Sequence, residues 1–275
     1  MDAFKRPLAS IGRATVNAVE GIGYAGTLLF ESLYFAALGW RTGQPMRPRA
    51  LLEQMRQIGV DALPIVTMMS MTIGVMLGIQ FIAALSEFGA QSQVVVAVAK
   101  SVTREFGALI TAIIVAGRSG SALAARIGSM NVSQEIDALA SMGIEPVRYL
   151  AAPALIAMLI MLPVLTMFAD TVAIVGAALY SASSLNITPT AYIMETLSLL
   201  SSGDIWQGIA KAFVFATLIT LIGVTTGFGV TGGAEGVGRA VNQAVVISFL
   251  GIFAFNYAFT QALLATHPAI TTIAK

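Results

Sequence analysis

Five ionisable residues lie inside long apolar segments of the chain: Lys100, Arg104, Glu105, Asp170 and Lys211. A charge at the centre of a bilayer costs about 2.5–3.5 kcal/mol on insertion scales, so such residues usually face protein or a water-filled cavity. These five could form a structural ion-pair network, or they could line a polar pathway where Arg104 meets an anionic head group. Neighbours such as Arg104 and Glu105 do not face each other on a helix. We therefore expect Glu105 to pair with another helix or subunit.

A possible nucleophile is Ser119, which lies in a G-x-S-G context of the kind found in intramembrane serine proteases. Its base would have to be His267, the single histidine of the chain. A serine nucleophile must lie within hydrogen-bond reach of its base. The topology derived below separates Ser119 from His267 by a membrane thickness, so we expect no catalytic activity and a solvated His267.

Metal, cofactor and nucleotide sites have little support in the sequence. The chain has no cysteine, a single histidine and a net charge of +1, which argue against a metal site, a disulfide scaffold and nucleic-acid binding. Two G-x-G-x-x-G matches, at 21–26 and 227–232, follow no predicted strand, so we interpret them as helix packing or helix termination. No P-loop sequence is present, so the energy must come from a partner or a gradient.

The elements that must position these residues are membrane-spanning helices. Apolar residues make up 57% of the 275-residue chain and charged residues only 11%, against about 25% charged in an average soluble domain. A helix needs about 20 apolar residues to cross a bilayer. Five segments meet that length: 63–86, 94–116, 151–179, 206–229 and 243–265.

The cations predict how these segments are oriented. If residues 21–39 lie flat on the membrane, eleven Lys and Arg residues fall in segments on one side and only Lys275 on the other. Because cytoplasmic loops are enriched in cations, this favours a cytoplasmic N-terminus and an external C-terminus. In this topology the five intramembrane charges fall in the outer half of the bilayer, with Arg104 the deepest. A signal peptide is the competing interpretation of the N-terminus, but Glu31 does not suit its apolar region.

We therefore predict an all-α integral membrane protein with five transmembrane helices preceded by an interfacial amphipathic helix. Residues 1–62 would form the cytoplasmic and interfacial region, 63–265 the five-helix domain and 266–275 an external tail. Pro163 is expected to kink the third span.

The segment 117–153 is the most informative part of the sequence. Small residues recur at four-residue spacing in its first part and permit close helix contact: Gly117, Ser121 and Ala125. Asn131 and Gln134 form a possible capping box for a short helix that ends at Gly143. One face of that helix is apolar and its beginning is acidic: Ile136, Leu139 and Met142, with Glu135 and Asp137. An exposed apolar face favours a docking partner.

The run GRSGSALAARIGSM, followed by QEIDALASMGIEPVRYLAAP, resembles the signature of the MlaE/YrbE permease family. The segments at 101–120 and 232–246 resemble that family too, and the resemblance extends from about residue 45 to 262. It implies a non-catalytic membrane subunit of a lipid ABC transporter in the bacterial inner membrane. The 131–146 helix would be the coupling helix that seats on a separate cytoplasmic ATPase, which binds ATP and Mg²⁺.

The resemblance also implies a second permease copy, most simply in a homodimer, and an MCE-domain lipid-binding protein outside the membrane. The first two spans would line a lipid cavity at the dimer centre. The matching positions are Leu77, Gln80, Ala84, Leu85 and Phe88, with Arg104 and Glu105. Coupling to the ATPase would fall to Glu135, Ile136, Asp137, Leu139 and Met142. The rival hypotheses are a gradient-driven secondary transporter that uses the intramembrane charges and an intramembrane hydrolase that uses Ser119.

Overall fold

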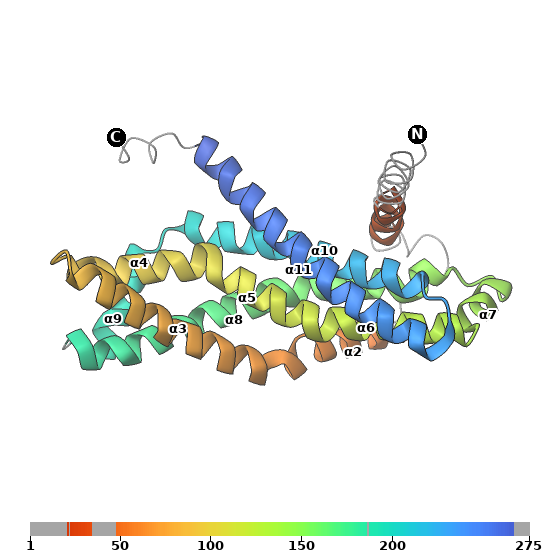
Figure 1. Ribbon diagram of the computed structural model, residues 1–275, viewed down its shortest axis with the longest axis horizontal. Helices are drawn as coiled ribbons and strands as arrows, with labels where there is room; N and C mark the ends of the chain where they lie inside the picture. The colour runs from red at the N-terminus through yellow and green to blue at the C-terminus, as the bar shows by residue number, and fades with distance from the viewer. Residues whose placement is uncertain (1–20, 22, 35–47, 186, 267–275) are drawn as a thin grey trace, which may run out of the picture.

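The computed structural model describes residues 21, 23–34, 48–185 and 187–266, and in these residues all regular structure is helical (Figure 1). The elements are α2 (Pro48–Ile58), η1 (Val60–Ala62), α3 (Leu63–Ser86), η2 (Gln91–Gln93), α4 (Val94–Ser101), η3 (Val102–Phe106), α5 (Gly107–Val115), η4 (Ala116–Gly120), α6 (Ser121–Val132), α7 (Glu135–Ser141), η5 (Val147–Ala151), α8 (Ala152–Leu185), α9 (Pro189–Leu199), α10 (Ser202–Phe228) and α11 (Gly233–Thr266).

Five of the described helical stretches are long and apolar enough to cross a membrane, which confirms the predicted number of spans. Several continue well beyond the predicted boundaries: the second runs from Gln91 to Val132 and the fifth begins at Gly233. Apolar composition marks the part of a helix that suits hydrocarbon, but backbone hydrogen bonding carries the helix further into water. The third span, α8, continues as one helix on both sides of Pro163.

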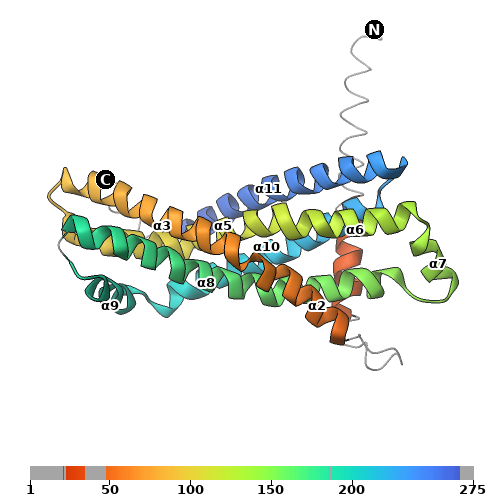
Figure 2. The same cartoon turned by 90° about the horizontal axis from the view of Figure 1, so that it is seen from below.

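The connections alternate between the two ends of the bundle. Both views place α7 at one end and α9 at the other (Figures 1 and 2). The turn between α3 and α4 lies at the α9 end. This arrangement agrees with five successive crossings.

Helix α8 is the centre of the bundle and packs against α2, α3, α5, α9 and α10. Its contact with α3 is especially close because glycines face the opposite backbone. A Cβ on Gly74 would overlap the backbone of Ala173, and a Cβ on Gly176 would lie 2.6 Å from the carbonyl oxygen of Met71. Such small-residue contacts let membrane helices gain van der Waals packing without a hydrophobic driving force.

Small residues also join α6 to α10, but not the ones that the sequence analysis selected. The Cβ position of Gly117 is 4.0 Å from Phe249, and Ser121 and Ala125 are only partly buried. The tight contact instead uses Gly120, Gly223 and Gly227, with Gly120 O only 3.1 Å from a Cβ built on Gly223. The contact with α10 therefore uses a different stripe from the predicted one, since equal spacing along a helix does not reveal which stripe faces a given neighbour.

Residues 23–34 form a helix whose direction is roughly perpendicular to the long axis of the bundle (Figures 1 and 2). Its place in the membrane interface stays a prediction. Its Leu28 is buried with Ile127 and Val224 in a small apolar core. Residues 1–20 and 35–47 lie outside the described residues, as do His267 and the rest of the predicted external tail after Thr266.

Candidate functional site

Two ion pairs join the second span to α10 near the α9 end of the bundle. Arg104 donates through Nε to Asp204 Oδ1 at 2.5 Å, and its Nη2 lies 2.5 Å from the same oxygen. Asp204 is 3% exposed at its side chain, whereas Arg104 is 38% exposed. The pair therefore presents a guanidinium at the surface while its carboxylate is covered.

Glu105 makes the second ion pair, with a residue further along α10. Its Oε1 lies 2.5 Å from Nζ of Lys211, whose side chain is completely buried. The same carboxylate accepts hydrogen bonds from Asn256 at 3.0 Å and Thr260 at 3.1 Å, both on α11. Lys211 Nζ also lies 5.3 Å from the ring centroid of Phe259, within cation–π range. The prediction that Glu105 pairs with another helix is confirmed: it connects α10 and α11 to the second span.

The backbone around these two residues departs from the regular α-helix. Arg104 and Glu105 lie in η3, a π-helical segment between α4 and α5. A π-bulge inserts extra backbone into a helix and often occurs at functional sites. A Cβ on Gly208 would overlap the carbonyl oxygen of Thr103, so only a glycine lets α10 approach η3 this closely.

Asp204 was missed by the sequence analysis, although a signal was present. The Ser201-x-x-Asp204 spacing forms a capping box at the start of α10: the Ser201 hydroxyl accepts from the Asp204 backbone N–H at 3.3 Å, and Asp204 Oδ2 accepts from the Ser201 backbone N–H at 3.0 Å. One carboxylate thus caps a helix and binds Arg104. Asn256 and Thr260 were also missed, because an uncharged polar residue in an apolar span carries no distinctive pattern.

The other two intramembrane charges stand apart from these pairs. Asp170 lies against Gly107, and its Oδ1 is buried with no hydrogen-bond partner in the described chain. Lys100 shares the face of Arg104 and is partly buried. The guanidinium of Arg104 reaches Asp204 in the first turn of α10, whereas Asp170 lies against Gly107. That Arg104 is the deepest of the five charges in the bilayer stays a prediction.

The predicted pathway residues on α3 and in the turn after it divide into two groups. Gln80, Ala84 and Phe88 recur every four residues and are exposed, Phe88 by 81%. Leu77 and Leu85 instead pack against the apolar core that includes Val98 and Tyr192. Helix α3 contacts α4 and α8, whereas η3 contacts α10. Within one described chain, the α3 stripe and the Arg104–Glu105 pairs therefore form two separate surfaces.

The predicted coupling residues lie at the opposite end, on and just after α7. Glu135 and Asp137 are exposed and Met142 is 65% exposed, while Leu139 is partly buried. The expectation of a single exposed apolar face was wrong for Ile136, which is 8% exposed and packs with Ile127 and Val147 in the core of the chain itself.

The helix that carries these residues is also shorter than the predicted 131–146 segment. Asn131 lies within α6, and its side-chain amide donates to the carbonyl oxygens of Phe228 and Val230, so it does not cap α7. Gly143 ends α7 as predicted, with φ of +75° and the bond from Ile144 N–H to Leu139 O of a Schellman motif.

Ser119 has none of the surroundings that nucleophilic catalysis needs among the described residues. It lies in η4, and its hydroxyl has no hydrogen-bond partner among the described residues. The proposed base, His267, lies outside the described residues, and α11 carries the chain away from Ser119: Phe249 lies beside Gly117, and the seventeen residues on to Thr266 cover about 25 Å of helix. The described residues also contain no cluster of acidic, histidine or cysteine side chains that could hold a metal ion.

Five long apolar helices with charged pairs between them define a multi-pass, all-α membrane protein with a polar site toward one end of its bundle. Residues 51–262 match the family described as Permease MlaE. The chain belongs to this permease family.

Relatives support this assignment over almost the whole chain. A probable ABC transporter permease protein of Rickettsia typhi is 33% identical over 92% of this chain and 96% of its own length. The intermembrane phospholipid transport system permease protein MlaE of Haemophilus influenzae is 30% identical over 93% of this chain and 97% of its own length. The chloroplastic protein TRIGALACTOSYLDIACYLGLYCEROL 1 of Arabidopsis thaliana is 34% identical over 78% of this chain and 61% of its own length.

Proposed function

We propose that this chain is the membrane-spanning subunit of an ABC transporter that moves phospholipid, or a related lipid, across or out of the bacterial inner membrane. The match to the permease family over residues 51–262 carries this proposal. The relative from Haemophilus influenzae, which is similar over nearly its full length, is a phospholipid transport permease by name. ATP hydrolysis would occur in a partner subunit, so this chain would not itself be an enzyme.

Two surfaces of the bundle suit a lipid pathway at the α9 end. The exposed stripe of Gln80, Ala84 and Phe88 offers apolar and weakly polar contacts to acyl chains. The partly exposed guanidinium of Arg104 suits the phosphate of a head group, because arginine binds phosphate through several N–H donors. A second copy of the chain, in a homodimer, would bring these two surfaces together around one cavity. An MCE-domain protein on that side would exchange lipid with the cavity.

At the other end, α7 presents Glu135, Asp137 and Met142 to a cytoplasmic ATPase that binds ATP and Mg²⁺. Ile136 anchors α7 to the chain's own core. A push on the exposed side of α7 would therefore be transmitted through Ile136 to α6 and α8, because packed side chains transmit displacement with little compression.

The test is lipid transfer by the purified transporter, with all subunits that accompany it in mild detergent, after reconstitution into phospholipid vesicles. Ala84→Trp should block ATP-dependent transfer by filling the pathway. The matched control is Met68→Trp, another exposed apolar position on the same helix, 75% exposed and four turns away. Equal transfer by both variants, or an intact and active preparation without any ATPase, would contradict the proposal.

A gradient-driven secondary transporter is the alternative. The observation that favours it is the buried Oδ1 of Asp170, which has no hydrogen-bond partner among the described residues. In that case Asp170→Asn, or neutralisation of Glu105, should abolish the dependence of transport on an ion gradient. Under our proposal the D170N variant continues to transport lipid with ATP alone and without any gradient.

A further inference from the structure

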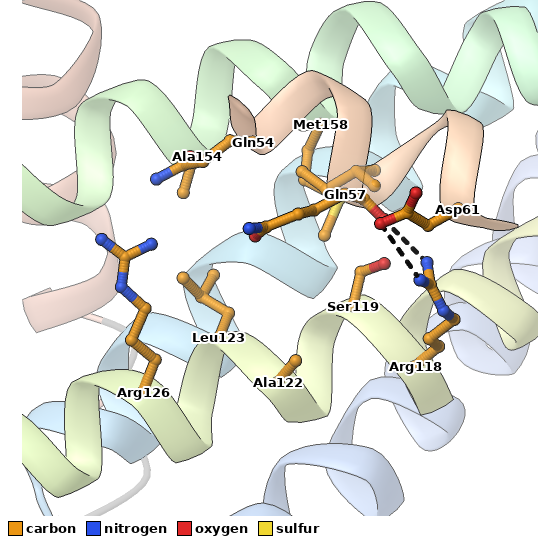
Figure 3. Close-up of a pocket in the computed structure, with 11 residues that line it drawn as sticks. Gln54, Gln57, Asp61, Arg118, Ser119, Ala122, Leu123, Arg126, Ala154 and Met158 are labelled. Carbon is orange, nitrogen blue, oxygen red and sulfur yellow. Dashed lines mark hydrogen bonds and ion pairs between the residues drawn. The ribbon is translucent and has the colours of Figure 1, made fainter. Parts of the chain in front are cut away.

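A hollow with polar walls lies at the junction of α2, η4, α6 and α8, away from the proposed lipid pathway (Figure 3). Its volume is about 290 Å³, near the lower end of the range for small-molecule sites. The polar residues that line it are Gln54, Gln57, Asp61, Arg118, Ser119 and Arg126. Figure 3 shows the side chains of Ser119, Arg118 and Arg126 rising from one wall toward Gln57 and Asp61 on the other.

Two buried polar atoms in this hollow lack partners. Gln54 is 8% exposed and Ser119 is 9% exposed, and neither Gln54 Oε1 nor Ser119 Oγ has a hydrogen-bond partner in the described chain. Most buried polar atoms in native structures are hydrogen-bonded, and an exception needs a physical reason, of which a bound molecule or ion is one. Here the two atoms offer a hydroxyl donor and an amide acceptor to one ligand.

The charges around the hollow favour an anion. Asp61 is the single acidic residue in its lining, and it lies 3.4 Å from Arg56 and 3.9 Å from Arg118, so its charge is offset. Arg118 also donates to the carbonyl oxygen of Gln57 at 2.7 Å, which fixes its position. Arg126 has no ion-pair or hydrogen-bond partner among the residues that the structure describes. With respect to these described residues its guanidinium fork is available to a ligand, and the geometry of the fork matches phosphate.

The predicted span boundaries put the hollow at the level of a lipid head group. Asp61 lies two residues before the first predicted span, which begins at residue 63, and Arg118 lies two residues after the second, which ends at residue 116. Basic pockets between helices at this level are suited to anionic lipid head groups. The remaining wall is apolar, with Ile58, Leu123 and Met158, and suits the carbon atoms of an ester.

We propose that this hollow binds a phosphate ester that carries a hydroxyl group. Arg126 and Arg118 would bind the phosphate oxygens together with the Ser119 hydroxyl, and Gln54 Oε1 would accept from the hydroxyl of the ligand. The ligand is either the head group of an anionic phospholipid or a water-soluble phosphate ester. The site is distinct from the proposed pathway, which lies toward the α9 end, and its occupancy does not depend on transport.

Binding is measured on the full-length protein, purified in detergent with any subunits that accompany it, in phosphate-free buffer. Native mass spectrometry follows titration with phosphatidylglycerol and, separately, phosphatidylcholine. Calorimetry follows titration with glycerol 3-phosphate and with inorganic phosphate. The variants are Arg126→Gln, which removes the free guanidinium, and Ala122→Leu, which fills the hollow without altering a charge. The matched control is Arg239→Gln, an exposed arginine paired with Glu235 elsewhere on the chain.

We expect phosphatidylglycerol to bind more tightly than phosphatidylcholine. R126Q should weaken its binding about tenfold, the loss of one charge-assisted hydrogen bond. A122L should weaken its binding as well, because the larger side chain occupies the space of the ligand. R239Q should bind like the unmodified protein. The same pattern with glycerol 3-phosphate, but not with the lipid, would assign the site to a soluble ester. Binding of both ligands that is unaffected by R126Q and A122L, or no binding of either, would overturn the proposal. Lipid retained in the pathway would be insensitive to these two variants, so the failure of one proposal does not imply failure of the other.

Discussion

Lys211 is completely buried between the helices, and its Nζ lies 2.5 Å from Oε1 of Glu105. Glu105 directly follows Arg104 in the chain, and Arg104 pairs with Asp204. A buried ammonium is tolerated in an apolar bundle only with a close opposite charge and further hydrogen bonds. Glu105 provides the charge, and Asn256 and Thr260 satisfy the carboxylate from α11. Three spans thus meet at one ion pair.

Removal of one partner from this pair should be costly. Glu105→Gln leaves Lys211 buried without a counter-charge, so we expect a loss of about 3–5 kcal/mol in unfolding free energy. The double variant Glu105→Gln with Lys211→Met should recover much of this loss, since it removes both charges. Thermal and denaturant unfolding in detergent measures the effect. A double variant no more stable than the E105Q single variant would show that the ion pair is not the cause.

The capping box at the start of α10 connects helix stability to the Arg104 site. Ser201→Ala removes the cap hydrogen bond from the Asp204 backbone N–H and the bond that the Ser201 hydroxyl donates to Asp204 Oδ2, and it should cost about 1 kcal/mol. Thr188→Ala is the matched control, because Thr188 caps α9 through its hydroxyl at 3.3 Å without contacting an ion pair. Both variants should lose similar stability, but only S201A should also lower lipid transfer, by loosening Asp204. If the two variants transfer lipid equally well, the helix cap does not contribute to the Arg104 site.

Two glycines one turn apart on α3 should respond oppositely to alanine. A Cβ on Gly74 would overlap the backbone of Ala173, so Gly74→Ala must push α3 away from α8 and should cost about 1–3 kcal/mol. A Cβ on Gly78 would have its nearest neighbour at 3.6 Å, an ordinary contact. Gly78→Ala should therefore be neutral or stabilising by about 0.5–1 kcal/mol, because alanine favours the helix. Thermal unfolding of both variants tests the close approach of α3 to α8. Equal changes in stability would contradict it.

Apolar residues of the α7 region should divide by burial. Ile136→Asp places a charge in the core with Ile127 and should greatly reduce the amount of folded protein. Met142→Asp changes a side chain that is 65% exposed, so the protein should fold normally and lose ATPase stimulation instead. Detergent-solubilised yield and ATP turnover in the assembled transporter distinguish the two. Normal folding of I136D would show that α7 is not anchored through this residue.

Composition and periodicity alone determined the class of this protein and the number of its spans. Apolar runs long enough to cross a bilayer can be read without knowledge of neighbours, because burial in hydrocarbon depends on each helix by itself. The same holds for the stop at Gly143, which depends on local backbone conformation, and for the inference that Glu105 needs a partner on another helix.

Only the tertiary structure decided which residues meet. Spacing placed Gly117 and Gly120 on different stripes of one helix, but packing against α10 selected Gly120. Spacing likewise grouped Ile136 with Met142, although Ile136 is buried in the core and Met142 is exposed. The pairing of Arg104 with Asp204 and of Glu105 with Lys211 spans about a hundred residues. The physical reason is that helical periodicity sets directions within one helix, whereas the partner on each side depends on how all the helices pack together.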